Sequence, residues 1–223
     1  MKSMEERVEL ITIDGVKISG IHYKIESPGA GILLLHMMPA AKESWRGFAA
    51  KLNEVGIGAL AVDLRGHGES DGGPDGYRTF TDEEHQLSIE DVKTGLKFQN
   101  EEGHSPLFVA GASIGANLAL NILAEDPEIE GAILLSAGIN YRGVQTLPAA
   151  KKIRPDQSVY VIAAKDDESK HGNCGELAED IFKALATDKK KLEVFDVGGH
   201  GTNIFWKHPD LMDRLVRWLQ ELI

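Results

Sequence analysis

A serine between two glycines carries the clearest chemical signal in the chain, in the motif Gly-Ala-Ser-Ile-Gly at residues 111–115. The apolar run before it, residues 105–110, is typical of a buried strand, and residues 114–123 are mostly good helix formers. A sharp turn from strand to helix strains its central residue and lifts that side chain clear of the sheet. The N–H groups of the helix N-terminus favour negative charge there. This setting predicts that Ser113 is a nucleophile.

A serine needs a general base at neutral pH, and the base needs a third group to orient it. In hydrolases with this strand–turn–helix arrangement, the acid and then the histidine follow the serine along the chain. One apolar strand runs into Asp166 and Asp167, and the last strand, residues 192–197, opens into His200. Both positions come just after strand ends, where open α/β sheets place their chemistry. The order Ser113, Asp167, His200 therefore fits a catalytic triad.

Three stretches together resemble the α/β-hydrolase family, in particular its small carboxylesterases and dienelactone-hydrolase-like members. They are Leu-Leu-Leu-His at 33–36, Asp-Leu-Arg-Gly-His-Gly-Glu-Ser at 63–70, and the serine motif at 111–115. The resemblance extends over nearly the whole chain. The family's acid usually stands fourth in a Gly-x-x-Asp pattern, which here reads Ala-Lys-Asp-Asp at 164–167. This position favours Asp167 over its neighbour as the triad acid.

The resemblance also implies an oxyanion hole, formed by the backbone N–H groups of Ile114 and Met38, with Met37 as the alternative to Met38. The chain departs from the family here, because Met37 stands where the family has a glycine. A backbone donor does not depend on its side chain, but methionine tolerates a positive φ poorly. The two methionines fit an apolar wall of the acyl pocket or the core. His36 is expected to be structural, as in the family.

The resemblance implies a serine hydrolase that cleaves carboxylic esters through an acyl-enzyme. A thioesterase or an acyl-peptide hydrolase would use the same residues, and a non-catalytic binding protein on this fold would normally have lost one of the three. Relatives with an aspartate nucleophile are disfavoured by Ser113. A cysteine-based dienelactone hydrolase is disfavoured because Cys174 lies far from the serine motif and is interpreted as structural. No cofactor or metal is expected, since the His171-x-x-Cys174 pair has no partner cluster.

Apolar and amphipathic segments alternate along the chain. Residues 9–13 and 16–23 flank Asp14-Gly15, which predicts an antiparallel hairpin. Strands are then expected near 31–36, 57–63, 105–111, 130–136, 158–164 and 190–196, and helices near 42–54, 84–102, 114–125, 174–186 and 208–222. Continuous apolar strands separated by helices imply a mostly parallel sheet covered on both faces. We expect one α/β-hydrolase domain, residues 1–223, with about eight strands and an N-terminal antiparallel hairpin.

The connections also bear on the substrate. Residues 137–157 are too few for a multi-helix lid, so an open site is expected that suits small or short-acyl soluble esters. The loop at 71–78 is rich in glycine, and it is expected either to form one lip of the pocket or to place Tyr77 and Arg78 on the surface.

Composition excludes several classes of protein. The chain has 223 residues, of which 42% are hydrophobic and 26% charged, close to globular averages. A net charge of −11 argues against a nucleic-acid partner, which needs a basic stripe. No apolar stretch approaches the roughly 18 residues of a membrane helix, and no secretory signal is visible. The single cysteine suits a reducing compartment. We expect a cytoplasmic enzyme whose partner is a small-molecule ester, with no membrane partner; the sequence leaves its oligomeric state open.

Overall fold

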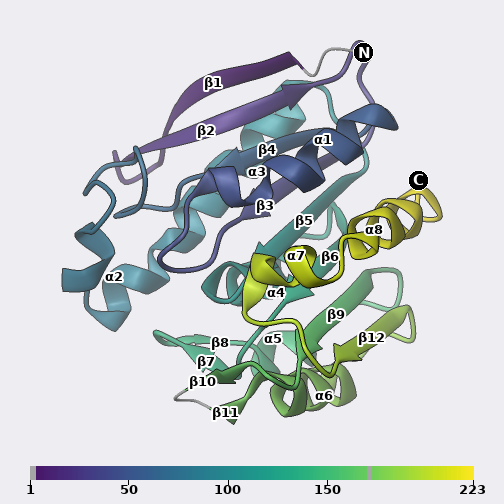
Figure 1. The fold of residues 1–223 in the computed structure, drawn as a ribbon. Coiled ribbons are helices and arrows are strands. Elements are labelled where there is room, and N and C mark those ends of the chain that lie inside the picture. Colours follow the sequence, from purple (N-terminus) through teal and green to yellow (C-terminus); the bar gives the residue numbers. More distant parts are fainter. Residues whose placement is uncertain (1–3, 170–171) are drawn as a thin grey trace.

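The computed structural model describes residues 4–169 and 172–223. Within them, an eight-stranded sheet has the order β1-β2-β4-β3-β5-β6-β9-β12 (Figure 1). Its strands are β1 (Met4–Ile11), β2 (Lys17–Lys24), β3 (Gly31–Leu35), β4 (Gly58–Val62), β5 (Leu107–Ala112), β6 (Ile129–Leu135), β9 (Ser158–Ala164) and β12 (Lys190–Phe195). β1 pairs with β2 and β2 with β4 in antiparallel fashion, and every later pairing in this sheet is parallel. The expected mostly parallel sheet with an antiparallel start is confirmed.

Helices surround the sheet. They are η1 (Lys42–Trp45), α1 (Arg46–Glu54), η2 (Gly76–Thr79), α2 (Asp82–Gln86), α3 (Ser88–Glu101), α4 (Ile114–Glu125), α5 (Leu147–Ala150), α6 (Cys174–Ala184), η3 (Gly201–Asn203), α7 (Ile204–Lys207) and α8 (Asp210–Gln220). Two small hairpins pair β7 (Asn140–Tyr141) with β8 (Val144–Gln145) and β10 (Glu168–Ser169) with β11 (Gly172–Asn173). None of the described helices has the length and hydropathy that a membrane span requires.

The core lies in two layers, one on each face of the sheet. Within β3, Leu33 and Leu35 pack into a cluster with α3, α4 and α6, whereas Ile32 and Leu34 pack into a cluster with α1, α7 and α8. This alternation follows from the two-residue period of a strand. Because both faces are covered, the central strands are apolar throughout, as the sequence pattern indicates.

Three predicted elements differ from the structure. The helix expected over 42–54 is a 3₁₀ turn, η1, followed by α1. The helix expected over 84–102 is two helices, α2 and α3, which divide at Leu87. α2 begins early because a capping box fixes its start: Glu84 N donates to Thr81 Oγ1 and Thr81 N donates to the Glu84 carboxylate. The first strand begins at Met4 rather than near residue 9, and Glu6 on this added length pairs across the hairpin with Lys24 at 2.5 Å.

The connection from β6 to β9 is short, as expected. It holds the β7–β8 hairpin and the four-residue α5, with no multi-helix lid in this described segment. The loop at 71–78 contains a buried residue, Tyr77, whose ring stacks on His67 with 4.3 Å between centroids. Arg78 is exposed and pairs with Asp75 at 2.6 Å. Of the two residues, only Arg78 is on the surface.

Candidate active site

Ser113 lies at the abrupt turn from β5 into α4. Its backbone has φ 55° and ψ −118°, an uncommon conformation for a residue with a side chain, and its N–H donates to Leu135 O at 2.8 Å. A Cβ on Gly111 would lie 2.1 Å from Gly115 O, so any larger residue there would force the strand and helix apart. α4 begins at Ile114, whose N–H lies in the first turn and has no acceptor within the helix.

The N-terminus of α4 packs directly on the end of β3. A Cβ on Gly115 would lie 2.5 Å from Leu35 O and 2.8 Å from His36 O. The Met37-Met38 loop begins at this point, so the two segments assigned to the oxyanion hole lie side by side. Met37 and Met38 are both half-buried and pack against opposite core clusters.

His36 connects this loop to the one after β4. Its Nε2 accepts a hydrogen bond from Leu64 N at 3.0 Å, so Nδ1 carries the proton and donates to Met37 O at 3.0 Å. Burial, together with the nearby His67, lowers the pKa of His36 to about 4. A neutral, fully buried ring with both nitrogens engaged agrees with a structural role.

His200 and Asp167 are in direct contact. His200 Nδ1 lies 2.9 Å from Oδ2 and 3.0 Å from Oδ1 of Asp167, which is almost fully buried. Burial alone would raise the pKa of Asp167, but the hydrogen bond and the charge of His200, with smaller contributions from the side chains of Ser136 and Cys174, outweigh it and hold the pKa below its ordinary value. The carboxylate therefore stays ionised beside the imidazole at neutral pH.

The loop that carries His200 lies against the serine turn. Gly201 has φ 57°, and a Cβ there would lie 2.4 Å from Met37 Sδ and 3.3 Å from Ala112 Cβ. Its N–H donates to Ser136 Oγ at 2.9 Å. The residue after the histidine thus touches both the residue before Ser113 and the oxyanion loop. The fold brings these segments together at the carboxyl ends of the parallel strands.

The two neighbouring aspartates differ in their contacts. Asp166 Oδ1 accepts hydrogen bonds from Gly198 N at 2.8 Å and from Gly199 N at 2.9 Å, and these bonds lower its pKa. Asp166 thus fixes the backbone that leads to His200, whereas Asp167 contacts the imidazole itself.

Two residues in this site were not predicted from the sequence. Cys174 was expected to be remote and structural, but its Sγ, a carboxylate oxygen of Asp167 and a ring nitrogen of His200 lie within 4.8 Å of one another. A metal ion could use the same three atoms, although the 2.9 Å Nδ1–Oδ2 contact has the length of a hydrogen bond. Ser136 directly follows a buried strand, a position that could have revealed it. His171 lies outside the described residues.

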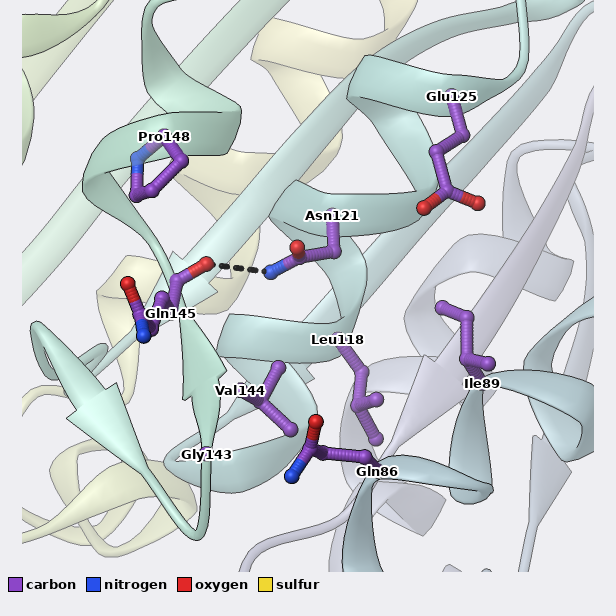
Figure 2. A pocket seen from close by; sticks show the side chains of 9 residues that line it. All are labelled: Gln86, Ile89, Leu118, Asn121, Glu125, Gly143, Val144, Gln145 and Pro148. Atoms are coloured by element: carbon purple, nitrogen blue, oxygen red, sulfur yellow. Dashed lines mark hydrogen bonds between the residues drawn. The ribbon is translucent and has the colours of Figure 1, made fainter. Parts of the chain in front are cut away.

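Two cavities differ in their relation to these segments. One of about 540 Å³ is lined by Met37, by Thr202 and Asn203 just after His200, and by Trp206, which is 87% exposed. The other, of about 370 Å³, lies between α4, the β7–β8 hairpin and the residues around the α2–α3 junction (Figure 2). Asn121 closes part of its wall by donating to Gln145 O at 2.9 Å. Only the first cavity borders the predicted active site.

The serine aminopeptidase S33 family of hydrolases matches residues 26–158, more than half of the chain. The chain belongs to this family. The matched region includes Ser113 and ends before Asp167 and His200. The S33-family chain is 43% identical over 68 residues to epoxide hydrolase 3 of Siraitia grosvenorii, covering 30% of this chain and 21% of that protein. It is 35% identical over 96 residues to thiohydrolase aneE of Aspergillus aculeatus, covering 43% of this chain and 29% of that protein. Both matches span less than a third of the relative's length.

Solved structures share the fold of this S33-family chain over nearly its full length. The Pyrococcus furiosus esterase Pf2001 has a TM-score of 0.81 at 22% identity, covering 99% of this chain and 91% of that one. The dienelactone hydrolase from Anabaena variabilis has a TM-score of 0.76 at 18% identity, covering 100% of this chain and 97% of that one. These likenesses, together with the sheet topology, establish the expected α/β-hydrolase fold.

Proposed function

We propose that this chain is a serine hydrolase that cleaves carboxylic esters, with Ser113 as nucleophile, His200 as general base and Asp167 as the orienting acid. One observation carries the proposal: the ionised, buried Asp167 holds His200 Nδ1 at 2.9 Å. The histidine sits on a loop that touches the residue before Ser113. A strained serine at a helix N-terminus beside such a pair has the parts that acyl transfer requires.

The proposed reaction proceeds in two halves. Ser113 Oγ attacks the ester carbonyl while His200 Nε2 accepts its proton, and Asp167 stabilises the resulting imidazolium. The backbone N–H groups of Ile114 and Met38 stabilise the oxyanion, where one such donor typically contributes about 10²–10³ in rate. The intermediate collapses, and His200 donates the proton to the departing alcohol. Water then attacks the acyl-enzyme by the same steps and releases the acid.

The proposed substrates are small or short-acyl esters. The short connection between β6 and β9 carries only a hairpin and one turn of helix, which supports a site open to solvent. The second candidate is thioester hydrolysis, favoured by the partial match to thiohydrolase aneE. An acyl-peptide hydrolase would use the same three residues on a different leaving group.

The test is hydrolysis of p-nitrophenyl esters from acetate to palmitate, compared with an acyl thioester series and with Ser113→Ala. We expect short chains to react fastest and Ser113→Ala to lower kcat by about 10⁴-fold or more. A fluorophosphonate probe should label the wild type and not the variant. Ser88→Ala, a buried serine at the start of α3, is the matched control and should keep full activity.

Each part of the proposal has its own refutation. Full activity of Ser113→Ala, or its labelling by the fluorophosphonate probe, would refute the assignment of Ser113 as the nucleophile. A preference for palmitate would overturn the substrate size, and faster thioester cleavage would support the second candidate instead. A wild type that is neither labelled nor active would indicate a binding protein on this fold.

A further inference from the structure

The carboxylate of Asp167 has side-chain partners beyond the imidazole. Cys174 Sγ lies within 4.8 Å of a carboxylate oxygen of Asp167 and of a ring nitrogen of His200, and the Ser136 and Cys174 side chains both stabilise the charged form of the acid. Ser136 also accepts a hydrogen bond from Gly201 N at 2.9 Å, so it connects the acid to the histidine loop. Cys174 comes from a different element, the first turn of α6, and its side chain is completely buried.

The Cys174 thiol is a neutral group in this environment. Burial raises the pKa of Cys174 to about 12, and the adjacent Asp167 carboxylate adds to the shift. An ionised carboxylate only accepts hydrogen bonds, so between these two neighbouring groups the thiol is the one that can donate. The hydroxyl of Tyr141 lies 3.7 Å from Sγ, and burial also raises the pKa of Tyr141. A thiol proton directed at the acid leaves Tyr141 O–H as the donor in the contact with the sulfur.

Backbone contacts fix the thiol relative to the acid. Cys174 N donates to Asp167 O at 2.9 Å. Asn173 caps α6 by accepting from Gly175 N at 2.9 Å, and its Nδ2 donates to Lys165 O at 2.7 Å. The start of α6 is thereby connected to the segment that carries the acid at two independent points. Sγ is held near the carboxylate by the fold rather than by a choice of rotamer alone.

We propose that Cys174 is a positioning residue of the active site, whose thiol donates a hydrogen bond to Asp167 and keeps that carboxylate aimed at His200 Nδ1. The inference rests on the proposed triad. It gives the one cysteine of the chain a role in the reaction without making it a nucleophile. The opposing interpretation is that the thiol only fills space between α6 and the sheet.

Three variants distinguish a hydrogen bond from packing. Cys174→Val keeps an apolar side chain but removes the donor, whereas Cys174→Ser keeps the donor and loses apolar volume. Cys174→Ala repeats the donor removal without the added bulk of valine. Ile181→Val, a buried position further along α6, is the packing control.

We expect Cys174→Val and Cys174→Ala to lower kcat by about three- to tenfold with KM within about twofold, since S–H is a weak donor and the loss of a hydrogen bond of ordinary strength has that size. The acidic limb of the kcat/KM profile should move upward by about half a pH unit, because a less solvated carboxylate retains the imidazolium proton more strongly. Cys174→Ser should restore most of the lost kcat and most of the shift in the pH profile. Ile181→Val should change neither kcat nor the pH profile.

A readout without substrate separates this inference from the proposed function. The low-field ¹H NMR signal of the His200 Nδ1 proton, assigned by its loss in His200→Ala, should shift in Cys174→Val and return in Cys174→Ser. An unshifted signal, or wild-type kinetics in Cys174→Val with a defect in Cys174→Ser, would overturn the positioning role. Failure of the wild type to cleave any ester would refute the proposed function, and the NMR comparison would still decide the contact.

Discussion

The substitution of aspartate by asparagine can be made at the adjacent Asp166 and Asp167, and we expect a large loss of activity at only one of them. Asp167→Asn removes the negative charge beside His200 and presents either an amide oxygen or an NH₂ group to Nδ1. Asp166→Asn keeps an oxygen that can accept from Gly198 N and Gly199 N, in an exposed position where charge matters little. If the triad is assigned correctly, only the first substitution disables the reaction.

The size of the effect follows from the contact distance. Two unit charges 2.9 Å apart, the Nδ1–Oδ2 separation, attract by about 6 kcal/mol at an effective dielectric constant of about 20. The attraction exists only when His200 is protonated, as it is in the transition state, so it acts on the barrier. At 1.36 kcal/mol per tenfold change, the loss corresponds to about 10⁴-fold in kcat. The same substitution in serine proteases has an effect of this order.

The assay is kcat/KM for p-nitrophenyl acetate, with thermal unfolding to verify that both variants fold. We expect Asp167→Asn to lose about 10⁴-fold and Asp166→Asn less than about threefold. Comparable losses in both variants would show that the loop, rather than the charge, controls activity. A larger loss in Asp166→Asn would refute the assignment of the acid altogether.

Three further predictions concern the support of the site. Gly115→Ala places a Cβ 2.5 Å from Leu35 O, so urea unfolding should show a loss of about 1–3 kcal/mol, and kcat/KM should fall at least about tenfold. Lys42→Ala leaves the buried Asp63 without its 2.5 Å partner and should cost about 3–5 kcal/mol in urea unfolding, against less than about 1 for the exposed Lys93→Ala. The folded-state pKa of His36, about 4, lies below its ordinary value. The unfolded state therefore binds more protons, and stability should fall by up to about 3 kcal/mol between pH ~6.5 and ~4, with a smaller slope in His36→Gln.

The fold was predictable because its signals are local. The hairpin turn at Asp14-Gly15, the apolar strands and the glycine pair around Ser113 each lie within a short stretch of chain. The boundary errors have local causes as well. The capping box of α2, which starts at Thr81, was readable from the threonine and the glutamate three residues later, and it divides the expected helix from the one that follows.

The environment of the acid was not predictable in the same way. Asp167 follows β9, but its partners come from the end of β6, the start of α6 and the loop after β12. Each of these positions is ordinary in its own stretch: a serine after a strand, and a cysteine at a helix start. These residues meet because the parallel sheet places the carboxyl ends of β6, β9 and β12 side by side.

This arrangement explains how a nearly buried carboxylate stays charged. Burial opposes the ionisation of Asp167, and the imidazole alone offers it one donor atom, Nδ1. The side chains of Ser136 and Cys174 further stabilise the charge from two different segments, and neither belongs to the serine motif or to the Gly-x-x-Asp pattern. In the proposed triad the acid must be ionised to stabilise a protonated His200, so the groups that keep it ionised would be part of the catalytic requirement. A substitution at Cys174 should therefore change the reaction even though the three triad residues remain in place.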